Sequence, residues 1–141
     1  MNERPPESPA GAISLSIPLI SGESGTAHLG GELHFDAHEP YAVTLRVRTA
    51  ARSVDWVFSR ELLADGLLRP SGSGDVQVWP CHNVRGDAVA VIELHAPTGK
   101  ALLRTPAPAV QEFVNEIFAA VPLGTECIHL DIDAVVEKLL S

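Results

Sequence analysis

The sequence predicts an α+β fold in which antiparallel β-sheets carry one short internal helix and are followed by two C-terminal helices. Apolar residues alternate with period two through the first two thirds of the chain, and helical spacing dominates only after residue 106. The 141 residues are 45% hydrophobic and 20% charged, which is typical of one globular domain with a buried core. We expect this domain at residues 12–141, after a flexible tail rich in Pro and Glu at residues 1–11.

Three strands are predicted before residue 50. Apolar residues alternate at 13–19, where Pro18 favours a position at the edge of a sheet, and again at 33–35 and 41–47. Residues 21–25 are small and polar, so we expect a turn there.

The stretch 54–80 is expected to form a strand, a short helix, a glycine-rich turn and a second strand. Ser59 is placed to cap the helix, because its hydroxyl can accept a free N–H of the first turn. Gly66 is expected to end the helix in the left-handed conformation.

The rest of the chain combines two strands with the late helices. Residues 88–94 are almost all apolar, which indicates a strand that is either central in its sheet or covered on both faces, and residues 101–105 could pair back with it as a hairpin. Pro106 and Pro108 then introduce a helix that runs to residue 121, and a last helix is expected to begin at Asp131 or Asp133.

The formal net charge is −8, which argues against general nucleic-acid binding. Eight of the ten Lys and Arg residues nevertheless lie within residues 41–110. Five arginines fall within 24 positions and form the candidate partner-binding surface: Arg46, Arg48, Arg52, Arg60 and Arg69. Two interpretations stay open, a docking surface for an acidic partner or a solvated face that Asp55, Glu61 and Asp65 balance.

No catalytic, metal or cofactor site is predicted. Cys81, His82, Cys127 and His129 contain the atoms of a zinc site but not its usual spacing. Cys81 and His82 are adjacent, so they cannot easily present both side chains to one ion. Ser59, Asp65 and His82 lack a nucleophile elbow, and residues 72–74 lack the Lys and the following helix of a phosphate loop. No apolar run is long enough to insert into a membrane.

Several segments carry a resemblance to a known family: WVFSRELLADGL at 56–67, RPSGSGDVQVWP at 69–80, PTGKALL at 97–103 and VPLGTE at 121–126. They resemble the SsgA-like family of sporulation and cell-division proteins from actinomycetes, and the resemblance extends over about residues 12–141. The residues of the family motif are expected to have structural roles: Trp56, Phe58, Gly66, Pro70, Gly72, Gly74, Trp79 and Pro80.

The resemblance implies an adaptor, with no enzyme activity and no cofactor. It implies a whirly-like fold, a homotrimer, and protein partners such as the division-ring protein FtsZ or another SsgA-like protein. It also implies a cytoplasmic protein that concentrates at the cell septum. The alternative hypothesis is a nucleic-acid-binding module on a whirly-like sheet, which the arginines support and the acidic total opposes.

Overall fold

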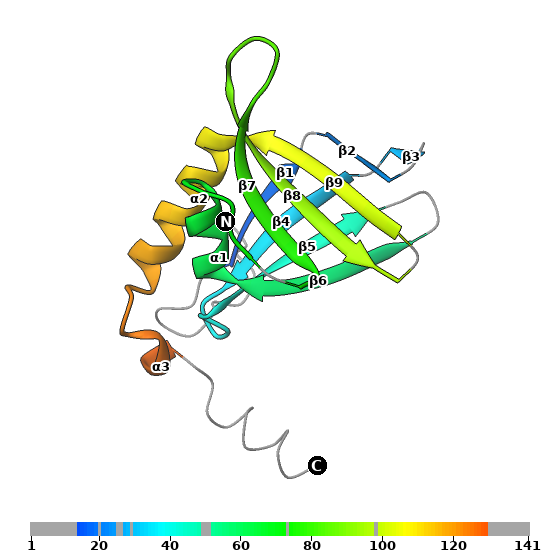
Figure 1. Ribbon diagram of the computed structural model, residues 1–141. Helices are drawn as coiled ribbons and strands as arrows, with labels where there is room; N and C mark the ends of the chain where they lie inside the picture. Colours follow the sequence, from blue (N-terminus) through cyan, green and yellow to red (C-terminus); the bar gives the residue numbers. More distant parts are fainter. Residues whose placement is uncertain are drawn as a thin grey trace, which may run out of the picture.

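Two antiparallel sheets face each other, and the helices lie along one side of them (Figure 1). The computed structural model describes residues 14–19, 21–24, 27–28, 30–48, 52–72, 74–97 and 99–129. The first sheet has the strand order β1 (Ser14–Leu19), β4 (Gly30–Asp36), β5 (Ala42–Arg48) and β6 (Ser53–Ser59). The second sheet has the order β3 (Ala27–His28), β2 (Ser21–Ser24), β9 (Gly99–Pro106), β8 (Ala88–Ala96) and β7 (Val76–His82). The predicted α+β class is confirmed.

The expectation of a turn at residues 21–25 is wrong for residues 21–24, and residue 25 lies outside the described residues. Residues 21–24 form β2, which pairs with β9 so that Ser21 lies opposite Arg104 and Glu23 opposite Leu102. The segment has no apolar alternation, but the backbone ladder with β9 needs none, since every residue brings its own N–H and C=O.

The core lies between the two sheets and follows the predicted alternation. Leu33, Leu45 and Ile92 are each fully buried, and they represent β4, β5 and β8. β8 is central, between β7 and β9, and it is also covered on its other face, where Val91 is only 5% exposed. The prediction of a strand that is either central or covered on both faces is therefore confirmed.

The helix α1 (Arg60–Gly66) begins as the sequence predicts and ends for a different reason. The Ser59 hydroxyl accepts a hydrogen bond from the Leu62 N–H at 3.0 Å, so Ser59 is the N-cap. Gly66 is the last helical residue, and its φ is not positive, so the expected left-handed ending is wrong. A Cβ at Gly66 would lie 2.4 Å from a methyl carbon of Val78. Glycine is needed there because α1 packs directly onto β7.

The helix α2 (Ala107–Ala120) closes one side of the two sheets. It contacts β1 of the first sheet and both β8 and β9 of the second. Its buried stripe has the predicted spacing and consists of Val110, Phe113, Val114 and Ile117. A short helix α3 (Glu126–His129) follows it. The predicted helix from Asp131 or Asp133 and the tail at residues 1–11 lie outside the described residues.

Within the part of the chain that the structure describes, no helix has the length and apolar character that crossing a membrane would require.

Candidate protein-binding surface

The five arginines of the predicted surface do not come together in the structure. Arg46 and Arg48 lie on the outer face of the first sheet, whereas Arg60 is buried at the start of α1 with 1% exposure. Arg52 immediately precedes β6, and Arg69 follows α1 on an exposed segment. The five arginines are close in sequence but do not form one basic patch in the structure.

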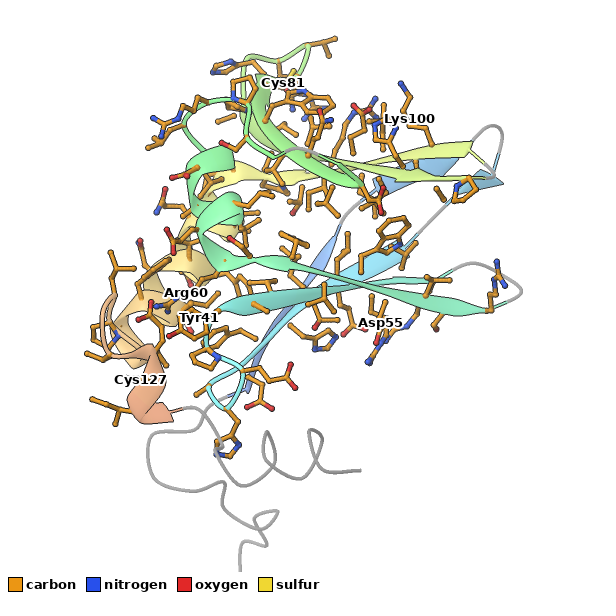
Figure 2. The ribbon with its side chains drawn as sticks, turned by 60° about the horizontal axis from the view of Figure 1, so that its bottom comes forward. Tyr41, Asp55, Arg60, Cys81, Lys100 and Cys127 are labelled. Atoms are coloured by element: carbon orange, nitrogen blue, oxygen red, sulfur yellow. The ribbon has the colours of Figure 1, made fainter. Side chains whose placement is uncertain are left out.

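Acidic side chains on the outer face of the first sheet pair with the arginines of the same face. Arg46 lies directly opposite Asp55 in the β5–β6 pairing. Its Nε donates to Asp55 Oδ1 at 2.9 Å and its second guanidinium nitrogen to Oδ2 at 3.2 Å. The hydrogen bond from Arg46 holds the pKa of the Asp55 carboxyl below its ordinary value, and the same bond raises the pKa of Arg46. Figure 2 shows Asp55 on the side of this sheet that faces away from the second sheet.

Arg48 is also paired. Its guanidinium forms an ion pair with Glu32 of β4, and the same carboxylate lies 3.8 Å from His34. The interpretation of a solvated face with balanced charges therefore describes Arg46 and Arg48. Asp55 balances Arg46 as expected, and Glu32, rather than Glu61 or Asp65, balances Arg48.

The placement of Arg60 on a binding surface is wrong. Its guanidinium donates to the Val121 backbone carbonyl at 2.7 Å and to Glu126 Oε2 at 2.8 Å. It also lies over the Phe118 ring, 4.1 Å from the centroid. An unpaired buried guanidinium is very costly, so burial here depends on these partners. Figure 2 shows Arg60 beside Tyr41 and near the segment that carries Cys127.

Glu126 completes the buried cluster around Arg60. Its second carboxylate oxygen accepts from the Gly124 N–H at 2.8 Å. Its own backbone N–H and the Arg60 guanidinium hold the pKa of the Glu126 carboxyl below its ordinary value. The cluster thereby fixes the chain after α2 against the start of α1.

The residues of the family motif have structural positions. Phe58 is buried, and Trp56 packs against the core from the same face of β6. Gly72 and Gly74 have positive φ values of 106° and 95° and make the turn before β7, while Pro70 precedes it on an exposed segment. Trp79 is half-buried on the opposite face of β7 from Val78, and Pro80 follows at the edge of the second sheet.

The cysteines lie on separate parts of the molecule. Cys81 is exposed on β7 and Cys127 is exposed in α3, and Figure 2 shows the two far apart in its view. Among the described residues, no three His, Cys, Asp or Glu side chains form a group that could hold a metal ion.

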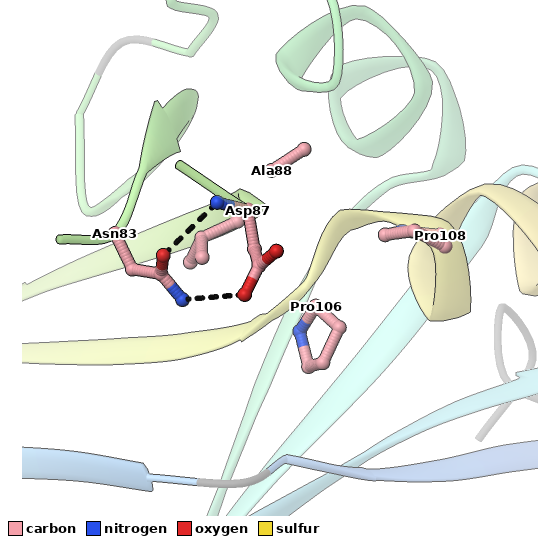
Figure 3. A pocket seen from close by; sticks show the side chains of 6 residues that line it. Asn83, Asp87, Ala88, Pro106 and Pro108 are labelled. Atoms are coloured by element: carbon pink, nitrogen blue, oxygen red, sulfur yellow. Dashed lines mark hydrogen bonds between the residues drawn. The ribbon is translucent and has the colours of Figure 1, made fainter. Parts of the chain in front are cut away.

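A shallow pocket of about 340 Å³ lies beside the β7–β8 loop (Figure 3). The loop side chains of this pocket are already engaged with each other. Asn83 Oδ1 accepts from the N–H groups of Arg85 and Asp87 at 2.9 and 3.0 Å, and its Nδ2 donates to Asp87 Oδ2 at 3.4 Å. The other lining residues are Ala88, Val89, Pro106 and Pro108. This arrangement shapes the loop and offers no group poised for chemistry.

Exposed apolar side chains are the feature that sequence reasoning missed. Val57 on β6 is 63% exposed, Leu68 after α1 is 76% exposed, and Val84 at the tip of the β7–β8 loop is completely exposed. The period-two alternation already put Val57 on the face opposite Trp56 and Phe58, so its exposure was readable. Single exposed apolar side chains are ordinary at a protein surface, whereas a contiguous apolar patch would mark an interface.

The chain matches known proteins along most of its length. Residues 29–126 match the model of the family described as Streptomyces sporulation and cell division protein, SsgA. The sporulation-specific cell division protein SsgB of Streptomyces coelicolor is 44% identical over 92% of this chain and 95% of its own length. SsgB of Kineococcus radiotolerans is 40% identical over 92% of this chain and 78% of its own.

Two solved structures share the fold. One is of SsgB, studied for mutations that correlate with longitudinal cell division during sporulation of Streptomyces coelicolor. It has a TM-score of 0.74 and 38% identity, and covers 87% of this chain and all of that one. The other is an SsgA-like sporulation-specific cell division protein from Thermobifida fusca, with a TM-score of 0.74 and 26% identity, over 94% and 99% of the two chains.

Proposed function

The chain belongs to the SsgA family and has a role in cell division during sporulation, and we propose that it acts there as an adaptor that positions or controls the septum through protein contacts. The observation that carries the proposal is the match to SsgB of Streptomyces coelicolor across 92% of the chain. Its direct partner is FtsZ or another SsgA-like protein, and it assembles as a homotrimer that concentrates at the septum.

The described surface of the protein carries its exposed apolar side chains singly rather than in one patch. Its exposed apolar side chains lie on separate elements, with Val57 on β6, Leu68 after α1 and Val84 at the β7–β8 loop. An adaptor needs at least two contact surfaces, and side chains on separate elements can serve different partners. The polar groups of the pocket at Asn83 are occupied by each other, so among the described residues that pocket gives no support to catalysis.

The nucleic-acid alternative receives little support from the described residues. Arg46 and Arg48 are paired with Asp55 and Glu32, and Arg60 is buried. A net charge of −8 would repel a phosphate backbone. A flat titration with DNA and RNA at low salt is therefore the expected result.

The adaptor role is tested by imaging a fluorescent fusion of the full chain through sporulation. We expect a ladder of septal bands that is lost when FtsZ is depleted, with the free fluorescent protein as control. Co-sedimentation of the purified chain with FtsZ filaments then asks whether the contact is direct. Diffuse fluorescence at every stage, together with no binding to FtsZ or to any SsgA-like paralogue, would refute the proposal.

A further inference from the structure

The outer edge of β6 is open in the described part of the molecule. β6 is the last strand of the first sheet, and among the described residues only β5 pairs with it. The edge of the second sheet at β7 differs, because Ser71 exchanges both backbone hydrogen bonds with Val78 at 2.8 and 2.9 Å. Pro80 further along β7 has no N–H to offer. Of these two edge strands, β7 is protected at this point, whereas β6 has no partner on its outer side among the described residues.

The register of β6 identifies the backbone groups that face outward. In the β5–β6 pairing, Val43 lies opposite Phe58 and Leu45 opposite Trp56. The Arg60 N–H donates to the Tyr41 carbonyl at 2.9 Å, which makes 41–60 a hydrogen-bonded pair. Such pairs alternate with non-bonded pairs in an antiparallel ladder. The N–H and C=O groups of Val54, Trp56 and Phe58 therefore point to β5, and those of Ser53, Asp55 and Val57 point away from it.

Natural proteins usually block an open edge with proline, lysine or a bulge, because such an edge binds other strands. β6 contains neither proline nor lysine over its seven residues, and its pairing with β5 is continuous. Its one charged side chain, Asp55, is paired with Arg46. Val57 and Val54 are 63% and 39% exposed, so the edge also offers apolar side chains.

We propose that the free edge of β6 accepts an extended, neutral-to-basic segment of a partner protein as an additional strand. Backbone bonds to Ser53, Asp55 and Val57 would supply affinity, and an apolar side chain packed against Val57 would supply specificity. The preference for a basic residue at the α1 end of the segment follows from Glu61, which is exposed just beyond the end of β6. The proposal rests on the adaptor role and names the surface through which that role is exercised.

The test uses the full chain and a peptide of the stated chemistry, so it needs no division protein. A capped peptide with the β5 sequence AVTLRVR has β-branched residues and two arginines. We expect the amide exchange of Asp55 and Val57, followed by NMR, to slow by about 10-fold or more at saturating peptide. The amides of Val54, Trp56 and Phe58 already face β5 and should change little. A peptide with proline at the central leucine keeps the charge and should not bind.

Substitutions on the protein provide the matched control. Val57→Lys puts a cation on the edge and should lower the affinity for the peptide by about 10-fold or more. Val84→Lys makes the same chemical change at the β7–β8 tip, away from the edge, and should leave affinity unchanged. Val57→Thr keeps a β-branched side chain and should bind nearly as wild type.

Three results would overturn the proposal. The first is that millimolar peptide does not slow the amide exchange of Asp55 and Val57. The second is that the two lysine variants weaken peptide binding equally. The third is slowing that appears with protein concentration alone, because the edge would then be occupied by a second copy. If the chain binds the peptide but does not bind FtsZ, the result counts against FtsZ as the partner and leaves the site at β6 supported. The two proposals therefore fail separately.

Discussion

Arg46 and Arg60 belong to the same arginine-rich stretch of sequence and have opposite environments. Arg46 pairs with Asp55 on the outer face of the first sheet, where its side chain is 40% exposed. Arg60 pairs with Glu126 at nearly the same distance, 2.8 Å against 2.9 Å, but its side chain is 1% exposed. Two ion pairs of similar length therefore differ in whether water can solvate the remaining charge once one partner is removed.

The comparison shows that burial and the number of partners decide the role of an arginine. Arg60 holds the Val121 carbonyl, Glu126 and the Phe118 ring together, and these belong to the end of α2 and the segment after it. Arg46 holds one neighbour on the adjacent strand. We therefore expect Arg60 to stabilise the tertiary structure and Arg46 to contribute little to it.

The largest effect is expected for Arg60→Ala. It removes one partner of a buried ion pair and leaves Glu126 without its cation, which typically costs about 3–5 kcal/mol. Chemical denaturation measures the free energy of unfolding, and Arg46→Ala is the matched control because the same atoms are removed. Similar losses for the two variants would contradict the comparison.

An intermediate effect is expected on acidification. The pKa of Glu126 is lower in the folded protein than its ordinary value of 4.5, so folding favours the ionised carboxylate. This contribution is complete above pH 4.5 and is lost as the pH falls through the lower folded pKa. Glu126→Gln should remove this part of the acid dependence of unfolding, since an amide does not titrate. Parallel pH curves for wild type and variant would show that other carboxylates cause the acid loss.

The smallest effect is expected for Arg46→Ala. Both partners of this pair are well exposed, and exposed pairs contribute little because water solvates the separated charges. The variant should unfold within experimental error of wild type. Any remaining difference should disappear at about 1 M salt, where charges are screened over roughly 3 Å. A difference that survives high salt would point to lost packing of the side chain.

Much of the fold was readable from local patterns. The alternation at 41–47 and 54–58 predicted β5 and β6 and their buried faces, and the helical spacing after Pro106 predicted α2. The capping of α1 by Ser59 was also correct, because a cap depends on residues three positions apart. Periodicity and capping depend on neighbouring residues, so they can be predicted without knowledge of the tertiary structure.

The prediction for Arg60 is wrong because distant segments meet around it. Nothing near Arg60 in the sequence indicates that Val121 and Glu126, more than 60 positions away, would bury it. The need for Gly66 likewise comes from Val78 on the facing strand. β2 was missed because its pairing with β9 joins residues about 80 positions apart and requires no apolar pattern.

By itself, the sequence determined the α+β class, the buried faces of the main strands and, through its segments at 56–80, the SsgA family. Only the tertiary structure decided which arginines are buried, why Gly66 is glycine, and that β6 lies at the edge of its sheet. The physical reason is range. Side-chain periodicity and capping act over a few residues, whereas burial, ion pairing and strand order depend on segments that only folding brings together.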